Sequence, residues 1–356
     1  MIMKQIYEQL KLNLLKTSNL SEQFFIRLIY SMNIEFPIFQ SSFKLMINDT
    51  FSVFLLVQLT FRMKEHPQTT QAQTDRLIDI EAVFRQKNPK LFKAIPGFVF
   101  QYLKRVIHQD QINDFIQRSK HLYGLDFVDA AITEFNPTVI IHGHENIPVS
   151  DRIIVASNHP LGGLDGIALM QAVGRVRPDI QFPVNDILLY VDNLKPLFIP
   201  INKHGSNAEN IRILNDTFAG DKVICYFPFG LVSRKKGGRI YDLEWKKTFL
   251  SKAKKYKRNI VPVHIVGRNS GFFYNLSNFR KFLGIKANIE MLYLADEFFK
   301  QYNKKIIITF GKPIDYKVFD KRNTDQEWAT QLRNYSYRLS TNPNEIFNPE
   351  TSYTLY

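Results

Sequence analysis

The chain has 356 residues, 45% of them hydrophobic, which is enough to bury the core of one large domain or two ordinary ones. Its net charge of +14 at pH 7 favours an anionic partner such as nucleic acid, a membrane face or an acidic carrier protein. No nucleic-acid-binding motif accompanies that charge, so no nucleic acid partner is expected. The single cysteine, Cys225, excludes an internal disulfide and fits a reducing compartment. No uncharged apolar run reaches the about 20 residues that span a bilayer, so the protein is expected to be soluble or to lie on a membrane.

The first 62 residues differ from the rest, because they contain no glycine and a single proline, Pro37. We interpret residues 1–62 as an atypical extension, either a membrane-docking arm or an over-long gene start with Met63 as the true first residue. The second interpretation is preferred, and a chain that begins at Met63 is expected to fold and stay active. A polar stretch over residues 64–75 follows and is typical of a linker.

The region 63–135 is expected to be helical. Helices are expected over residues 98–107, 109–122 and 126–135, the last of them capped by Asp126. The helix over 98–107 combines aromatic and basic residues, as does the later run from Phe272 to Lys281. Each of these two segments could lie in a bilayer interface, or could pack on the rest of the protein.

Strands alternate with helices from residue 136 onward. Strands are expected at 139–141, 153–156, 182–184, 196–200, 222–227, 260–266 and 306–310, and helices after Asp165, after a capping box at Ser206, over 243–257 and after Thr324. This alternation predicts an α/β fold, with a largely parallel central sheet flanked by helices over residues 136–315. A C-terminal helix and a loose tail are expected in residues 316–356. Ligands of such sheets gather at the carboxyl ends of the strands.

The segment from Val155 to Gly166 places one histidine and one aspartate between a buried strand and a helix. His159 and Asp165 are close enough along the chain to form a hydrogen bond. A histidine held by a carboxylate can act as a general base toward a hydroxyl or an amine. Gly162 and Gly163 allow backbone with positive φ, which would let the two side chains converge. The alternative is an ordinary loop histidine beside a helix-capping aspartate.

Four short motifs follow one another along the chain. They are Asn-His-Pro-Leu-Gly-Gly-Leu-Asp at 158–165, Phe-Ile-Pro-Ile-Asn-Lys at 198–203, Phe-Pro-Phe-Gly-Leu-Val-Ser-Arg at 227–234 and Ile-Val-Pro-Val at 260–263. In this order they resemble the Asn-His-x4-Asp, Phe-Ile-Asp-Arg, Phe-Pro-Glu-Gly-Thr-Arg-Ser and Val-Pro-Val boxes of the PlsC-like superfamily of glycerol-phosphate and lysophospholipid acyltransferases. The pattern looks most like the branch that includes the amino-acid N-acyltransferases of glycine and ornithine lipids.

The chain departs from that superfamily at its charged positions. Five residues rather than four separate His159 from Asp165, and Phe229 stands where the third box has glutamate. Arg234 is displaced by two positions, and Lys203 stands in place of the arginine of the second box. Because the superfamily uses those positions largely to hold the acceptor's phosphate, the changes favour a smaller or singly charged acceptor. N-acylation of a small amino acid is therefore expected over acylation of lysophosphatidate.

The resemblance implies an acyltransferase in which His159 takes a proton from the acceptor while Asp165 orients its ring. The acceptor would then attack the thioester of acyl carrier protein or acyl-CoA, the expected co-substrate, and backbone N–H groups near Gly230 would stabilise the oxyanion. Substrate binding is assigned to Asn158, Lys203, Phe229, Gly230, Ser233 and Arg234. No metal or cofactor is expected, because a thioester is already activated and the His142–Glu145 segment offers no third zinc ligand.

The acceptor is expected to be an amino-acid amine of the glycine- or ornithine-lipid type, or a glycerol-phosphate or lysophospholipid hydroxyl. Acyl carrier protein and an anionic membrane surface are the expected partners, and the oligomeric state stays open. The expected location is cytoplasmic, peripheral on the inner face of the cytoplasmic membrane. One alternative is a catalytically decayed, basic membrane- or nucleic-acid-binding protein. Another is a serine hydrolase that uses Ser157, although the Gly-x-Ser-x-Gly motif is missing.

Overall fold

The computed structural model describes residues 78–87, 89–184, 188, 191–200 and 207–355. The expectations for residues 1–62 and 64–75, for Lys203 and for the cap at Ser206 lie outside the described residues. Within the described ranges, no helix combines the length and the apolar character that crossing a bilayer requires.

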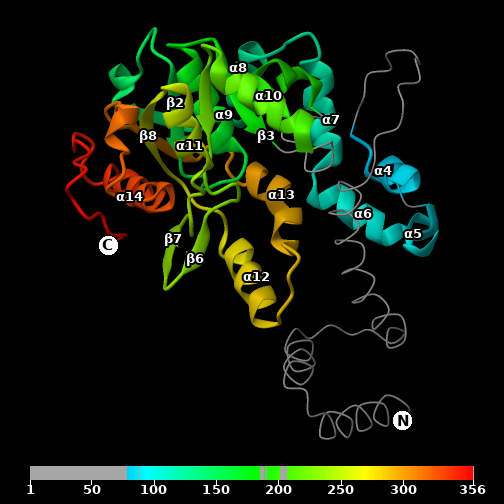
Figure 1. The fold of residues 1–356 in the computed structure, drawn as a ribbon. Helices are drawn as coiled ribbons and strands as arrows, with labels where there is room; N and C mark the ends of the chain where they lie inside the picture. The colour runs from blue at the N-terminus through cyan, green and yellow to red at the C-terminus, as the bar shows by residue number, and fades with distance from the viewer. Residues whose placement is uncertain (1–77, 88, 185–187, 189–190, 201–206, 356) are drawn as a thin grey trace, which may run out of the picture.

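Seven strands form one sheet in the order β1-β9-β8-β2-β5-β3-β4 (Figure 1). Neighbouring strands are parallel except β8 and β9, which run antiparallel. The strands are β1 (Thr138–His142), β2 (Ile153–Ser157), β3 (Ile180–Val184), β4 (Phe198–Pro200), β5 (Val223–Tyr226), β8 (Asn259–Val266) and β9 (Lys305–Phe310). A separate antiparallel hairpin joins β6 (Arg234–Lys236) to β7 (Arg239–Tyr241). The predicted α/β class with a largely parallel sheet is confirmed.

Helices cover both faces of the sheet, because successive side chains of a strand point to opposite faces. In β2, Ile153 and Val155 pack with residues of α8 and α9. Ile154 and Ala156, on the other face, pack with residues of α10, α11 and α14. These helices are α8 (Leu125–Phe135), α9 (Leu164–Gly174), α10 (Asn207–Ala219), α11 (Thr248–Tyr256) and α14 (Asp325–Arg338). The all-buried strand β2 thus lies between two apolar layers at the centre of the fold.

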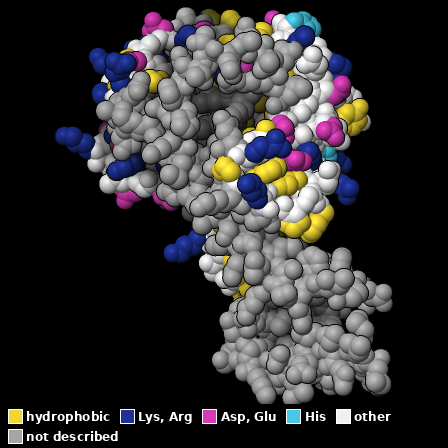
Figure 2. Space-filling view, turned by 90° about the vertical axis from the view of Figure 1, so that its right-hand side faces the viewer, with side chains coloured by type: hydrophobic (Ala, Val, Ile, Leu, Met, Phe, Trp, Pro, Cys, Tyr) yellow, Lys and Arg dark blue, Asp and Glu magenta, His cyan; other side chains and the backbone are white. Residues whose placement is uncertain are grey.

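Of the region 63–135 that was predicted to be helical, the residues described from 78 onward are mostly helical. Its helices are α4 (Ile80–Lys87), α5 (Pro89–Ala94), α6 (Gly97–Val106) and α7 (Gln109–Arg118). In α6, Phe100 and Leu103 are buried, whereas Phe98 and Tyr102 are exposed. Figure 2, which views the molecule from the side of α4–α7, shows hydrophobic, basic and acidic side chains intermixed on the described part of this face.

Two further helices, α12 (Gly271–Phe282) and α13 (Leu294–Phe299), lie beside the β6–β7 hairpin and α6 (Figure 1). The hydroxyl of Tyr102 in α6 lies 2.7 Å from that of Tyr293, whose ring packs edge-on against Phe272 of α12. Phe272 is exposed, while the next residue, Phe273, is fully buried. Both aromatic-basic segments therefore have one packed face and one exposed face.

Two local expectations are wrong. Gly124, with φ of +60°, occupies the N-cap position of α8, so Asp126 lies inside the first turn of the helix and does not cap it. The tail after Ser340 is not loose, because Phe347 and Tyr353 are buried and stack on each other beside α14. The cap at Thr324 is confirmed, with a complete capping box to Glu327.

Candidate active site

The imidazole of His159 is held by the carboxylate of Asp165. Nδ1 of His159 lies 3.0 Å from Oδ2 of Asp165. Because β2 ends at Ser157 and α9 begins at Leu164, both side chains lie at the carboxyl end of a central strand. The Asp165 side chain is fully buried, whereas 19% of the His159 side chain is exposed. The ring is thus fixed through Nδ1 and still reachable by a substrate.

Asp165 also organises the loop that carries His159. Its Oδ2 accepts a hydrogen bond from the backbone N–H of Leu161 at 2.8 Å. Its Oδ1 accepts from the N–H groups of Gly163 at 3.0 Å and Gly166 at 2.9 Å. A carboxylate that accepts several N–H groups is stabilised in its charged form. The one side chain therefore fixes both the loop and the histidine.

Electrostatics favour a charged pair. Burial raises the pKa of Asp165, but the charge and hydrogen bond of His159, together with the backbone N–H groups, outweigh it and hold that pKa below 3.8. Burial likewise lowers the pKa of His159, but Asp165 and the charge of Asp242 outweigh it and hold that pKa above 6.5. An imidazole with a raised pKa is a stronger base toward an acceptor's proton.

The two glycines of the loop are both needed at their positions. Gly162 has a φ of +83°, and a Cβ built there would lie 2.5 Å from a methyl carbon of Val232. A Cβ on Gly163 would lie 2.5 Å from the ring of Phe298. Gly162 supplies the left-handed backbone with which the loop accommodates five residues between histidine and aspartate.

The third box lies against this loop. β5 pairs with β2, and the box begins where β5 ends, so Phe227 stacks on the imidazole of His159 with ring centroids 4.1 Å apart. The backbone N–H of Ser233 donates to the carbonyl of His159 at 2.8 Å. The structure therefore brings the first and third boxes together at one edge of the sheet.

Several residues assigned to substrate binding have partners within the protein. Asn158 is buried, and its amide donates to the carbonyl of Ile265 at 2.9 Å and accepts from the N–H of Ile265 at 2.7 Å. These bonds tie the end of β2 to β8. Ser233 is buried too, and its hydroxyl lies 2.6 Å from Oδ1 of Asp242, to which it donates. Both polar side chains thus hold the strand and the loop in position through hydrogen bonds within the protein.

Arg234 is also engaged inside the protein. Its guanidinium is 3% exposed and lies 3.0 Å from Glu290, which is fully buried and also pairs with Arg280 at 2.5 Å. Arg234 further donates to the carbonyl of Val232 at 2.8 Å. The guanidinium of Arg234 is thus engaged by a carboxylate and a carbonyl of the protein itself.

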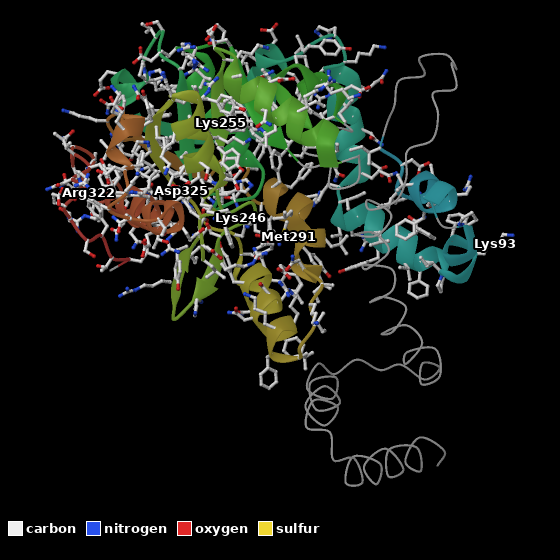
Figure 3. The ribbon with its side chains drawn as sticks, viewed as in Figure 1. Lys93, Lys246, Lys255, Met291, Arg322 and Asp325 are labelled. Carbon is white, nitrogen blue, oxygen red and sulfur yellow. The ribbon has the colours of Figure 1, made fainter. Side chains whose placement is uncertain are left out.

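The Phe-Pro-Phe-Gly turn carries the remaining two assigned residues. Phe229 packs with the apolar residues on the face of the sheet that α10, α11 and α14 cover, and it is 7% exposed. Gly230 is exposed with a φ of +67°, and its own N–H donates to the carbonyl of Phe227. The ammonium of Lys246, labelled in Figure 3, would lie 3.7 Å from a Cβ built on Gly230. Lys246 is an exposed cation beside this turn.

Comparison with known proteins identifies the family. A family model described as "Acyltransferase" matches residues 82–343. The lyso-glycine lipid O-acyltransferase of Bacteroides thetaiotaomicron is 47% identical over 265 residues, which cover 74% of this chain and 97% of that protein. The chain belongs to the acyltransferase family. A second lyso-glycine lipid O-acyltransferase, from Phocaeicola vulgatus, is 46% identical over 265 residues, covering 74% of this chain and 95% of that protein.

The predicted PlsC-like assignment, close to the amino-acid-lipid branch, is confirmed by these relatives. The crystal structure of the 1-acyl-sn-glycerophosphate acyltransferase PlsC from Thermotoga maritima aligns with 86% of this chain and 95% of its own. The TM-score is 0.40 and the sequence identity 16%.

The sequence analysis of this acyltransferase missed Asp242. Its carboxylate is fully buried, with Oδ1 3.4 Å from the backbone nitrogen of His159 and Oδ2 2.9 Å from the indole nitrogen of Trp245. Asp242 and His159 are 83 positions apart in the chain. Asp242 lies between the hairpin and α11, where no periodic pattern or spacing to His159 marks it. Only the neighbouring tryptophan, which is rare in this chain, could have drawn attention to it.

Proposed function

We propose that this acyltransferase moves a fatty acyl group from a thioester donor to the hydroxyl of a lyso-glycine-lipid type of acceptor. The observation that carries the proposal is the His159–Asp165 pair. Since Asp165 accepts at Nδ1, the neutral imidazole carries its proton there, and Nε2 is left to take the acceptor's proton. The deprotonated oxygen attacks the thioester carbonyl, an ester forms as the C–S bond breaks, and the donor's sulfur takes the proton back from the imidazolium and leaves as a thiol. Asp165 supports the imidazolium that forms in this step.

The acceptor's head group is proposed to carry a single negative charge. Arg234 is paired with Glu290 and is buried, so it does not offer the planar fork that suits a phosphate dianion. Lys246 beside Gly230 offers a point charge, which suits one carboxylate. A singly charged head group agrees with the names of the two relatives, both lyso-glycine lipid O-acyltransferases, since glycine offers one carboxylate.

The relatives also favour a hydroxyl over an amine as the acylated atom, since both are named O-acyltransferases. The proposal therefore keeps the amino-acid lipid expected from the sequence but moves the acylation from nitrogen to oxygen. A hydroxyl suits His159 as base equally well, because its proton is removed as the new bond forms.

The assay that tests this proposal supplies one labelled acyl donor and three acceptors: a lyso-glycine lipid, free glycine and lysophosphatidate. The lyso-glycine lipid is expected to be acylated at its hydroxyl, with a kcat/KM at least tenfold above the other two. The donor is offered both as acyl carrier protein thioester and as acyl-CoA, and we propose the acyl carrier protein form because its acidic surface suits a chain of charge +14. Acylation of glycine or lysophosphatidate in preference would refute the acceptor, and full activity in His159→Gln would refute the mechanism.

Membrane attachment is proposed to be peripheral. Phe98 and Tyr102 of α6 and Phe272 of α12 are exposed. Tyr293, which contacts Tyr102 and packs against Phe272, links the two helices. Aromatic side chains beside lysines and arginines favour the interface of an anionic bilayer. Binding to vesicles that contain anionic lipid is expected to weaken as salt rises, because exposed charges are screened. Attachment that resists both salt and high pH would contradict this proposal.

A further inference from the structure

Asp242 contacts the backbone of His159, whereas Asp165 contacts its ring. Its Oδ1 accepts from the hydroxyl of Ser233 at 2.6 Å and lies 3.4 Å from the nitrogen of His159. Ser233 in turn donates its backbone N–H to the carbonyl of His159. The backbone N–H of His159 therefore contacts Asp242, and its backbone C=O accepts a hydrogen bond from Ser233.

Burial raises the pKa of Asp242 above its usual value, whereas the hydrogen bonds from Ser233 and Trp245 and the charge of His159 act in the opposite direction and favour the ionised form. The two oxygens of Asp242 accept from groups that can only donate, the backbone N–H of His159 on one side and the indole N–H of Trp245 on the other. Among the described residues, no ion pair with a lysine or arginine engages the Asp242 carboxylate. Arg333 reaches the backbone carbonyl of Asp242 instead. The imidazolium of His159 is thus a natural counter-charge for this carboxylate.

We propose that Asp242 is a positioning residue for His159, which clamps the histidine's backbone and supplies a second negative charge near its ring. The inference rests on the proposed role of His159 as general base. It explains why the third box of this chain keeps Ser233 although the glutamate is replaced by Phe229. In this chain Ser233 supports His159 through its hydrogen bond to Asp242.

Other titratable groups around the histidine bear on the same charge balance. They are Asp165 from α9, Tyr274 from α12 near Asp165, and Tyr337 and Arg333 from α14 near Asp242, with Lys246 at the adjoining turn. Asp165 and Asp242 are the two whose charges raise the pKa of His159, which burial by itself lowers. A variant that removes only the charge of Asp242 separates its contribution from that of Asp165.

The charge is isolated by comparing Trp245→Phe with Trp245→Phe/Asp242→Asn. Asparagine alone would turn an N–H group toward the N–H of Trp245, and phenylalanine removes that conflict. Both variants therefore keep the acceptor for Ser233 and differ in one charge. The pKa of His159 is read by NMR on protein with labelled histidine, with the signal assigned from its loss in His159→Gln. The acid limb of the acyl-transfer pH profile is recorded alongside.

The pKa of His159 is expected to be lower by about one unit in the double variant than in Trp245→Phe. The acid limb of activity moves to lower pH by the same amount. Equal values in two folded variants would overturn the inference, because a merely structural aspartate does not change the titration of the ring. Should the double variant not fold, Asp242→Ser in the Trp245→Phe background replaces it, with the same two outcomes. The titration needs no activity, so its result is separate from a failure of His159→Gln to abolish acyl transfer.

Discussion

The ring of Phe227 lies nearly parallel to the imidazole of His159, at an interplanar angle of 19° and a centroid distance of 4.1 Å. The two residues follow neighbouring parallel strands, so the contact depends on the pairing of β2 with β5. The stack covers one face of the imidazole and restricts its rotation, leaving an edge for the substrate. Phe227 thus couples the third box to the first, although it lies 68 positions after His159 in the chain.

Replacing Phe227 by leucine is expected to lower kcat/KM by about 2- to 12-fold, since an aromatic pair contributes about 0.5–1.5 kcal/mol beyond its buried area. Phe227→Tyr keeps the stack and is expected to stay within about twofold. Steady-state kinetics of both variants test this, with circular dichroism as a check on folding. A leucine variant as active as tyrosine would show that the stack does not orient His159.

Asp165→Asn is expected to reduce kcat by about 10³- to 10⁴-fold, because the amide no longer supports the imidazolium or fixes the tautomer. The same change turns an N–H group toward some of the backbone donors of Leu161 and Gly163, so we expect a loss of about 1–3 kcal/mol in unfolding free energy. Urea unfolding measures the second effect and single-turnover acyl transfer the first. Activity within tenfold of the parent would contradict the role given to Asp165.

The pH dependence of activity follows from the raised pKa of His159. Acyl transfer requires the neutral ring, so kcat/KM is expected to rise with pH through a midpoint above 6.5. For stability the sign is opposite: the contribution of the charged His159 is fully present below 6.5 and is lost as pH rises through the folded pKa. The lowered pKa of Asp165 contributes stability above 3.8 that is lost as pH falls through its folded value. An activity profile over about pH 4–9 tests the first sign, and a midpoint below 6.5 would contradict it. Urea-unfolding profiles over about pH 2–9 test the two stability signs, and a stability that does not fall below pH 3.8 would contradict the one given to Asp165.

Patterns local in sequence predicted much of the fold. The strands at β2, β5, β8 and β9 follow from short β-branched runs, and the cap at Thr324 from its serine/threonine–glutamate spacing. The predicted start of α8 is wrong because aspartate is a favoured N-cap residue and drew the start to Asp126, whereas Gly124, with a φ of +60°, occupies that position. The buried tail was missed because its packing depends on contacts between distant residues, such as Tyr353 with Tyr335.

The candidate site was predictable only where its residues lie within one loop. His159 and Asp165 are six positions apart, and a short loop brings them together whatever the rest of the fold does. The substrate-binding assignments to Ser233 and Arg234 came from the resemblance to a family box. Their side chains instead meet Asp242 and Glu290, which are distant or unmarked in the sequence and which only the folded chain brings alongside.

The left-handed backbone of Gly162 allows a test with a matched glycine. Gly162→Ala would place a methyl group 2.5 Å from a carbon of Val232 and strain a φ of +83°, so both stability and activity are expected to fall, stability by about 1–3 kcal/mol. Gly271, in the first turn of α12, has nothing within 4 Å of a Cβ, and Gly271→Ala is expected to be neutral or stabilising by up to about 1 kcal/mol. Thermal unfolding and acyl-transfer rates of the two variants make the comparison. Equal behaviour would show that the loop tolerates a side chain at Gly162.

The last prediction separates two roles for Arg234. If its buried pair with Glu290 is structural, Arg234→Lys lowers the unfolding free energy, and Glu290→Gln, which leaves two guanidiniums without their carboxylate, costs more, about 3–5 kcal/mol. The KM of the folded Arg234→Lys protein for its acceptor then stays within about twofold of the parent, because the guanidinium does not touch the substrate. Lys235, the next residue of β6, is exposed, and Lys235→Ala is the control expected to change neither quantity. A tenfold rise in acceptor KM for Arg234→Lys with unchanged unfolding would return Arg234 to the acceptor site, as the family resemblance implied.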